Sequence, residues 1–202
     1  MIYKKALTNN IFNHICSCAD ELGIECYVIG GFVRDYIIDN STAKDIDIVV
    51  VGDGIEFAKN VSQKLKNTPK VTIFKTYGTA MFKYNDMEIE FVGARKESYS
   101  KESRNPKVST GTLEDDQNRR DFTINSMAFS LNKMNYGALV DPFNGLADIQ
   151  NKVIRTPLSP EITYNDDPLR MLRAIRFATK LDFKINEDSL ESIESLSSRI
   201  KI

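Results

Sequence analysis

The spacing of hydrophobic residues predicts alternating helices and strands over most of the chain. Apolar residues four apart predict a helix over Ala6–Glu21, and Gly23 follows it as a stop signal. The mostly polar stretch Tyr99–Gly111 predicts a loop. The other elements predicted before residue 141 are the strands Cys26–Ile29, Asp45–Val51, Val71–Phe74, Thr79–Tyr84, Met87–Val92 and Gly137–Val140, the helices Phe32–Ile38 and Ile55–Leu65, and the helical or mixed segments Leu113–Arg120 and Ile124–Leu131.

The pattern becomes wholly helical after Pro160, where helices are predicted over Pro168–Leu181 and Glu187–Ile202. Strands and helices come first along the chain and helices alone come afterwards. This order favours an α/β (α+β) head followed by an all-α part.

Composition removes several classes of function. Charged residues make up 27% of the chain and hydrophobic residues 42%, which is ordinary globular composition, and the net charge of −1 provides no overall attraction for nucleic acid. Three cysteines without a CxxC pair argue against a disulfide framework or a zinc knuckle, and a single histidine argues against His-based nucleophilic catalysis. We find no signal peptide and no apolar run of membrane-spanning length, so we expect a cytoplasmic protein.

Two acidic residues, Asp45 and Asp47, lie two apart on a predicted strand. Successive side chains of a strand point to opposite faces, so both carboxylates face one way while Ile46 and Ile48 face the core. Adjacent anions repel, and Mg²⁺, which prefers carboxylate and phosphate oxygens, would relieve that repulsion. Glu90, on a second predicted strand, is a third candidate ligand if the strands are neighbours. The alternative is that all three are ordinary solvent-facing acids.

A glycine turn, Gly30-Gly31, separates a predicted strand from a predicted helix that carries Arg34 and Asp35. Glycines let backbone N–H groups approach an anion, and a helix N-terminus favours phosphate. A cation such as Arg34 opposes the helix dipole unless an anion lies nearby, and Asp35 is placed to orient it. The alternative is a plain turn.

Two further segments carry arginines beside acids. The first segment is Arg119–Asn125, in which Arg120 is a candidate contact for a triphosphate and Asp121 and Asn125 would fix the local geometry. The alternative is that Asp121 or Thr123 caps a helix and the arginines are exposed. The second segment opens a helix at Pro168, so Asp167 either caps that helix or presents acceptors to a nucleotide base. The arginines at positions 170, 173 and 176 step by three along one side of this helix and should pair with anionic or planar groups.

In their order along the chain, these motifs resemble those of class II nucleotidyltransferases, the family of bacterial-type CCA-adding enzymes and related poly(A) polymerases. The resemblance runs from about residue 28 to 180. One departure is Asp166, which stands where the family usually has Glu. The matching stretches are Gly30–Asp35, Asp45–Asp47, Glu90–Arg95, Arg119–Asn125, Asp141–Gly145 and Asp166–Arg176.

The resemblance implies a polymerase-β-like head over residues 1–145, with a mixed sheet flanked by helices, and an all-α neck over residues 146–202. It implies Asp45, Asp47 and Glu90 as catalytic, Mg²⁺-binding carboxylates, and Asp167 with Arg170 as the pair that recognises the base of CTP or ATP. Asp141–Gly145 matches a flexible element between head and neck. The full set implied to bind nucleotide is Gly30, Gly31, Arg34, Arg120, Asp121, Asn125, Asp167, Arg170, Arg173 and Arg176.

The activity implied is transfer of CMP and AMP from CTP and ATP to the 3′ end of tRNA, in a catalytic fragment of a longer enzyme whose main RNA-binding regions lie outside this chain. The alternatives are a poly(A) polymerase adding AMP to RNA, an enzyme adding only C or only A, and a non-catalytic nucleotide-binding module.

Overall fold

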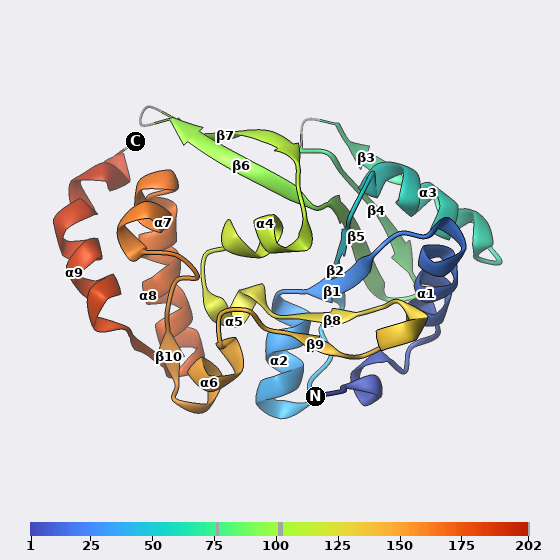
Figure 1. Cartoon of the computed structure of the whole chain (residues 1–202), viewed down its shortest axis with the longest axis horizontal. Helices are drawn as coiled ribbons and strands as arrows, with labels where there is room; N and C mark the ends of the chain where they lie inside the picture. The colour runs from blue at the N-terminus through green and yellow to red at the C-terminus, as the bar shows by residue number, and fades with distance from the viewer. Residues whose placement is uncertain (76, 101–102, 202) are drawn as a thin grey trace.

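A seven-stranded mixed sheet forms the centre of the computed structural model, which describes residues 1–75, 77–100 and 103–201 (Figure 1). The strands lie in the order β3-β4-β5-β2-β1-β8-β9. The pair β2–β5 is parallel, whereas the other neighbours are antiparallel. The mixed sheet confirms the predicted fold class. Its strands are β1 (Cys26–Ile29), β2 (Asp45–Val50), β3 (Thr72–Phe74), β4 (Thr79–Tyr84), β5 (Met87–Gly93), β8 (Ala128–Ser130) and β9 (Leu139–Val140).

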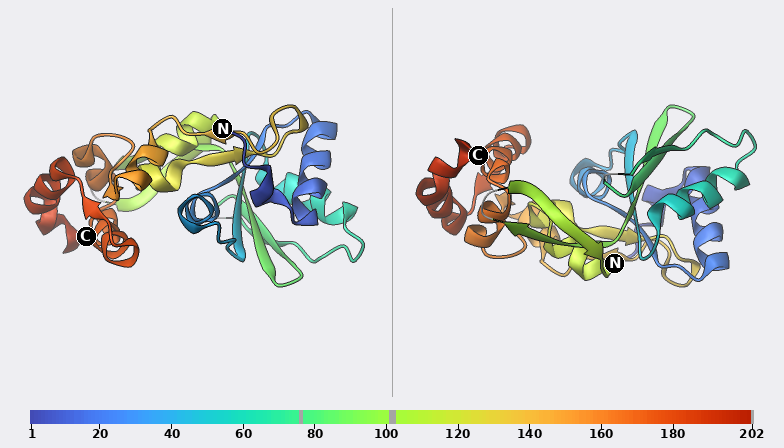
Figure 2. Two further views of the ribbon diagram at one scale, coloured as in Figure 1. Left: turned by 90° about the horizontal axis from the view of Figure 1, so that it is seen from below. Right: turned by 90° about the horizontal axis from the view of Figure 1, so that it is seen from above.

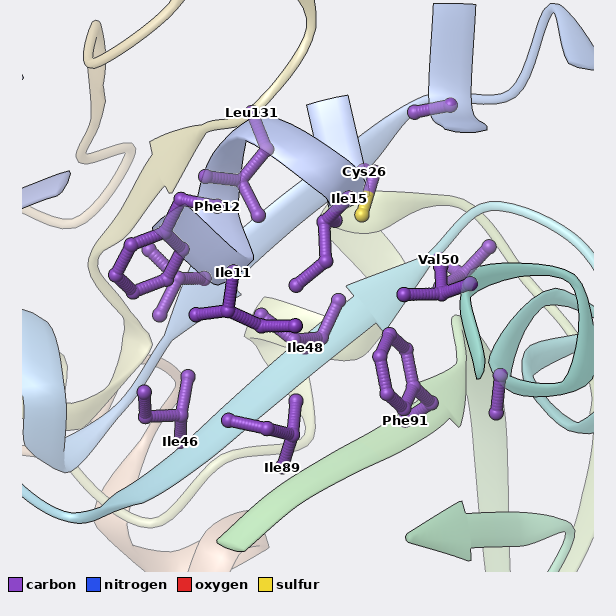
Figure 3. Packing of buried hydrophobic residues seen from close by; sticks show 14 of the residues in the cluster. Ile11, Phe12, Ile15, Cys26, Ile46, Ile48, Val50, Ile89, Phe91 and Leu131 are labelled. Atoms are coloured by element: carbon purple, nitrogen blue, oxygen red, sulfur yellow. The ribbon is translucent and has the colours of Figure 1, made fainter. Parts of the chain in front are cut away.

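Three amphipathic helices contribute to the main hydrophobic core: α1 (Asn10–Leu22), α2 (Gly31–Asp39) and α3 (Gly54–Lys64). Figure 3 shows side chains of α1 meeting those of β2 and β5. Ile46 and Ile48 of β2 are at most 1% exposed in this core, as the strand pattern predicts. Asp45 and Asp47 alternate with these isoleucines along β2, so their side chains face the other side of the sheet.

A polar β-hairpin, β6 (Arg95–Ser100) with β7 (Ser103–Thr110), occupies most of the segment for which a loop was predicted. The prediction for Tyr99–Gly111 was therefore wrong for the described residues, and residues 101–102 lie outside them. The two strands pair with each other in a sheet of their own. Without a strongly apolar face, these strands show little of the alternation by which a strand is recognised in sequence. The hairpin extends toward the helical part of the molecule (Figure 1).

Short helices connect the head to the helical part: α4 (Leu113–Asn118), α5 (Thr123–Ser126) and α6 (Gly145–Gln150). The helices α7 (Pro160–Asp166), α8 (Leu169–Leu181) and α9 (Glu187–Leu196) then gather at the end of the molecule opposite α1 and α3 (Figures 1 and 2). A 3-10 turn, η3 (Ser197–Lys201), follows α9, so α9 is shorter than predicted. None of the described helices has the length and apolar character needed to cross a membrane.

A small second core joins the helical part to the head. Phe122 and Ile124 of the α5 segment pack with Ala174 and Phe177 of α8. The two-residue strands β10 (Val153–Ile154) and β11 (Lys184–Ile185) form a parallel pair beside α8. They were not predicted, because so short a segment carries no hydrophobic period. The domain division at residue 145 stays a prediction.

Candidate active site

The acidic residues of β2 and β5 lie side by side. The parallel register places Asp47 opposite Glu90 and Asp45 opposite Glu88. The two strands are neighbours, which was the condition for Glu90 to be a third candidate ligand. Because Ile46 and Ile48 fill the core, the carboxylates of Asp45 and Asp47 share the opposite face of the sheet.

The electrostatic environment of Asp47 disfavours its charge in the absence of a cation. Burial raises the pKa of Asp47, Arg120 opposes that rise, and the neighbouring charges of Glu90 and Asp45 add to it. A divalent cation would neutralise this group of acids, and its preferred ligands are carboxylate and phosphate oxygens. The donor chemistry therefore fits such an ion.

The acids are neighbours without forming a closed ligand set. In the described parts of the chain, no three Asp, Glu, His or Cys side chains are arranged so that they could hold a metal ion as they stand. Magnesium usually keeps only one or two carboxylates and takes its remaining oxygens from water and substrate phosphates. The arrangement therefore suits an ion that arrives together with a nucleotide.

Arg120 lies above this acidic face, beside Gly30. A Cβ at Gly30 would lie 3.3 Å from Arg120 Nη1 and 3.5 Å from Asp47 Oδ2. Gly30 also has a φ of +81°, a backbone conformation that residues other than glycine rarely adopt. Glycine here therefore allows the backbone turn and the close approach of the guanidinium to the carboxylate. At Gly31 a Cβ would make only an ordinary contact, 3.6 Å from Arg34 Nη2.

Asp116 is a fully buried acid of α4 that the sequence reasoning missed. Its Oδ1 accepts from Arg119 Nε at 2.9 Å, and its Oδ2 lies 3.0 Å from Arg120 Nη2. Burial pushes its pKa upward, but Arg120 and Arg119 outweigh burial and hold the pKa below its usual range. Arg119 and Arg120 follow Asp116 by three and four residues on the predicted helix, and this spacing could have indicated the ion pairs from the sequence.

A second acid missed by the sequence reasoning, Glu97, links Arg119 to a further arginine, Arg95. Its Oε1 lies 2.8 Å from Arg95 Nη2 and 3.2 Å from Arg119 Nη1, and its side chain is 3% exposed. Arg95 also donates to the Tyr77 carbonyl oxygen at 2.9 Å. Glu97 lies between the predicted strand Met87–Val92 and the predicted loop Tyr99–Gly111, where no element was predicted, and it reaches Arg119 from β6.

Two of the acids, Asp47 and Glu90, and the arginines at positions 95, 119 and 120 border one pocket of about 270 Å³. Three larger hollows on the described surface have volumes of about 460, 480 and 310 Å³. The first two are lined by no carboxylate and the third by Asp86 without an arginine, so none of the three combines acids with arginines. Arginines that face carboxylates across an open pocket can accept a triphosphate accompanied by a cation. The residues lining it are Asp47, Val49, Tyr77, Thr79, Glu90, Val92, Arg95, Arg119 and Arg120.

Arg34 lies buried behind this pocket, with 5% of its surface exposed. Its Nε donates to Asp35 Oδ1 at 2.7 Å, and its Nη1 donates to Asn125 Oδ1 at 2.6 Å. The carboxylate of Asp35 therefore compensates the charge of Arg34 at the helix N-terminus, so a bound phosphate is not needed there to explain Arg34. Phosphate binding by Arg34 stays a prediction.

Asp121 and Asn125 are held in a local network of hydrogen bonds, and nucleotide binding by them stays a prediction. Asp121 Oδ1 accepts from the Phe122 backbone N–H at 2.8 Å and from Asn125 Nδ2 at 3.0 Å. Asp121 Oδ2 lies 2.6 Å from Arg173 Nη2. These contacts orient buried side chains. Neither Asp121 nor Asn125 lines the pocket, but the Asn125 backbone carbonyl oxygen accepts from Arg120 Nη1 at 3.4 Å.

The start of α8 carries the predicted base-recognition pair. The Oδ1 of Asp167 accepts from the Leu169 backbone N–H at 3.1 Å, so Asp167 caps the helix. Arg170 is 8% exposed, and its charge opposes the rise in pKa that burial causes at Asp166. The arginines are increasingly exposed along the helix: Arg170 is buried, Arg173 is half-buried and Arg176 is exposed. Base recognition by Asp167 and Arg170 stays a prediction.

The geometry agrees with the chain's similarities to known proteins. A tRNA nucleotidyltransferase described as A-adding, from Aquifex aeolicus (strain VF5), is 42% identical over 166 residues, which cover 82% of this chain and 20% of that protein. The structure of a CCA-adding enzyme in apo form II matches with a TM-score of 0.84 at 36% identity, covering 93% of this chain and 43% of that chain.

A third similarity is to a tRNA nucleotidyltransferase complexed with a primer tRNA and an incoming ATP analogue. It has a TM-score of 0.78 at 36% identity and covers 91% of this chain and 50% of that chain. This chain thus spans half or less of the length of each of these proteins. Residues 26–155 match the poly(A) polymerase head domain. The chain therefore belongs to the poly(A) polymerase head-domain family of nucleotidyltransferases.

Proposed function

We propose that this chain is the catalytic portion of an enzyme that transfers CMP and AMP from CTP and ATP to the 3′ end of tRNA, releasing pyrophosphate. The observation that carries the proposal is the pocket in which Asp47 and Glu90 lie in register beneath Arg120. An ionised triphosphate needs cations on one side, and a metal-assisted displacement needs carboxylates on the other.

We assign the metal to Asp45 and Asp47, with Glu90 as the third carboxylate, and propose Mg²⁺ as the ion. When bound, it would activate the attacking 3′-hydroxyl and neutralise charge on the leaving pyrophosphate. Arg120 would hold the triphosphate against this face, with Arg119 and Arg95 lining the same pocket. Gly30 keeps the approach to Asp47 open.

Base selection is assigned to Asp167 and Arg170 at the start of α8. A carboxylate presents only acceptors and a guanidinium only donors, so together they can match the polar edge of cytosine or adenine. Most of the tRNA contact is assigned to regions outside residues 1–202, because this chain carries a net charge of −1. The three free cysteines suit a reducing cytoplasm, the compartment we propose.

The experiment that tests this function supplies three RNAs to the protein with labelled CTP or ATP. The first is a tRNA that ends before CCA, the second is a tRNA that ends in CC, and the third is an unstructured RNA. Addition of CCA to the first supports the proposal. Addition of A alone to the CC end would support the narrower activity named for the Aquifex aeolicus relative. A long adenosine tail on the unstructured RNA would support a poly(A) polymerase instead.

Replacing Arg120 with alanine is expected to weaken nucleotide binding by about 10- to 100-fold, since a charge-assisted contact contributes about 1.5–3 kcal/mol. The measurement is equilibrium titration with ATP in the presence of Mg²⁺. Arg155→Ala is the matched control, because Arg155 pairs with Asp148 outside the pocket. Equal weakening in both variants would contradict the assignment of Arg120.

Replacing Asp167 with asparagine separates its two roles. Asparagine caps helices as well as aspartate does, so we expect the free energy of unfolding to change by less than about 0.5 kcal/mol. Its amide adds a donor where the carboxylate has only acceptors, so selection among the four nucleotides should change. The measurements are chemical unfolding and nucleotide competition. Unaltered selection would leave Asp167 as a helix cap alone.

A further inference from the structure

Five side chains form a closed ring of contacts behind the pocket, here called the arginine–phenylalanine ring. Arg34 Nη1 donates to Asn125 Oδ1 at 2.6 Å, and Asn125 Nδ2 donates to Asp121 Oδ1 at 3.0 Å. Asp121 Oδ2 accepts from Arg173 Nε at 2.8 Å. The phenyl group of Phe177 completes the arginine–phenylalanine ring, because the guanidinium carbons of Arg34 and Arg173 lie 5.1 and 5.4 Å from the phenyl centroid.

The arginine–phenylalanine ring joins elements that are remote in sequence. Arg34 comes from α2, directly after the glycine turn that lies beside Asp47. Arg173 and Phe177 come from α8, whose first turn carries Asp167 and Arg170. The ring therefore connects the acidic face of the sheet to the helix that carries the proposed base-recognition pair.

Most of this ring is closed to solvent and its charges are balanced within the protein. Arg34, Asp121, Asn125 and Phe177 are between 5% and 9% exposed. The two guanidinium groups are matched by the carboxylates of Asp35 and Asp121. A buried polar network whose members have partners holds one geometry, and desolvated cation–π contacts are stronger than exposed ones.

We propose that Phe177, acting through Arg34 and Arg173, is a positioning residue that sets α8 relative to the metal face and thereby sets nucleotide selection. The inference rests on the proposed function. It assigns Arg34 and Arg173 to holding the helix in place, whereas the sequence motifs suggested direct contact with the nucleotide. Selection depends on the distance between the triphosphate pocket and the base-recognition pair, and this ring spans the two.

The test compares Phe177→Leu, which removes the aromatic face, with Phe177→Tyr, which retains it. Binding of ATP, CTP, GTP and UTP is measured by equilibrium titration with Mg²⁺, well below the unfolding temperature of every variant. We expect Phe177→Leu to reduce discrimination between the preferred and the excluded nucleotides by at least about tenfold, and Phe177→Tyr to stay within about threefold of the unmodified protein.

Leu181→Ala is the control for simple loss of packing, because Leu181 ends α8 and packs against the same small core without belonging to the ring. It should lower thermal stability and leave discrimination unchanged. Unchanged discrimination in Phe177→Leu, or an equal loss in Leu181→Ala, would overturn the inference. If the unmodified protein bound no nucleotide, that result would contradict the proposed function itself, whereas the two outcomes above contradict only the positioning role of Phe177.

Arg34→Gln separates positioning from direct phosphate contact. All four nucleotides share the same triphosphate, so loss of a phosphate contact would weaken their binding equally and leave discrimination intact. Loss of positioning would weaken the preferred nucleotides more than the excluded ones. We expect the second result, and uniform weakening would overturn the inference.

Discussion

Replacing Asp45 and Asp47 together with alanine is expected to lower nucleotidyl transfer by at least about 10³-fold while the protein stays folded. Metal-assisted stabilisation of the transition state contributes several kcal/mol, and each 1.36 kcal/mol corresponds to a factor of ten in rate. The fold should survive, because Asp45 is exposed and because burial and the neighbouring acids raise the pKa of Asp47, which shows that its charge is unfavourable in the folded protein. The measurement is the rate of AMP incorporation at saturating Mg²⁺.

The control for this double variant is Asp86→Asn. Asp86 is an exposed acid in the turn between β4 and β5, where it pairs with Lys44 at 2.8 Å. The substitution Asp86→Asn removes one negative charge near the same sheet and changes no residue of the pocket, so nucleotidyl transfer should be retained. Full activity in the Asp45 and Asp47 double variant would overturn the catalytic assignment, and comparable loss in Asp86→Asn would attribute the effect to general charge.

Replacing Asp116 with alanine is expected to lower the free energy of unfolding by about 3–5 kcal/mol, the usual cost of removing one partner of a buried ion pair. Asp116 is fully buried and holds both Arg119 and Arg120, whose side chains are only 17% and 16% exposed. The measurement is denaturant unfolding at neutral pH. Glu114→Ala, on the exposed side of the same helix, should change the free energy by less than about 1 kcal/mol.

The same acid should give the protein a distinct pH dependence. Because the folded pKa of Asp116 is lowered, its stabilising contribution is present above its unfolded pKa and is lost as pH falls through the folded value. The difference in unfolding free energy between the unmodified protein and Asp116→Ala should therefore shrink below about pH 4. A difference that stayed constant on acidification would contradict the assigned ion pairs.

The strand that carries Asp45 and Asp47 could be predicted from sequence because its alternation is strong and one of its faces is buried. The same alternation made the two carboxylates share a face, and Figure 3 shows Ile46 and Ile48 in the core on the other side. The position of Glu90 beside Asp47 depended on strand order, which local patterns do not contain. The sequence motifs supplied both candidates, and the parallel register brought them together.

Contacts between distant segments could not be predicted. Arg34 was expected to meet a phosphate, yet its partners are Asp35 and Asn125, the latter 91 residues away. Glu97 went unrecognised because its hairpin has no apolar period, and its two arginine partners become neighbours only in the folded chain. Phe177 lies on the helix that carries Arg173, but its contact with Arg34 depends on α2, which is remote in sequence.

The most direct test is a crystal structure of this protein with Mg²⁺ and a non-hydrolysable ATP analogue. The account predicts the ion on the carboxylates of Asp45 and Asp47, the triphosphate against Arg120 in the pocket above Glu90, and the base within hydrogen-bonding distance of Asp167 and Arg170. A triphosphate bound away from these acids, or a base that leaves both Asp167 and Arg170 untouched, would contradict it.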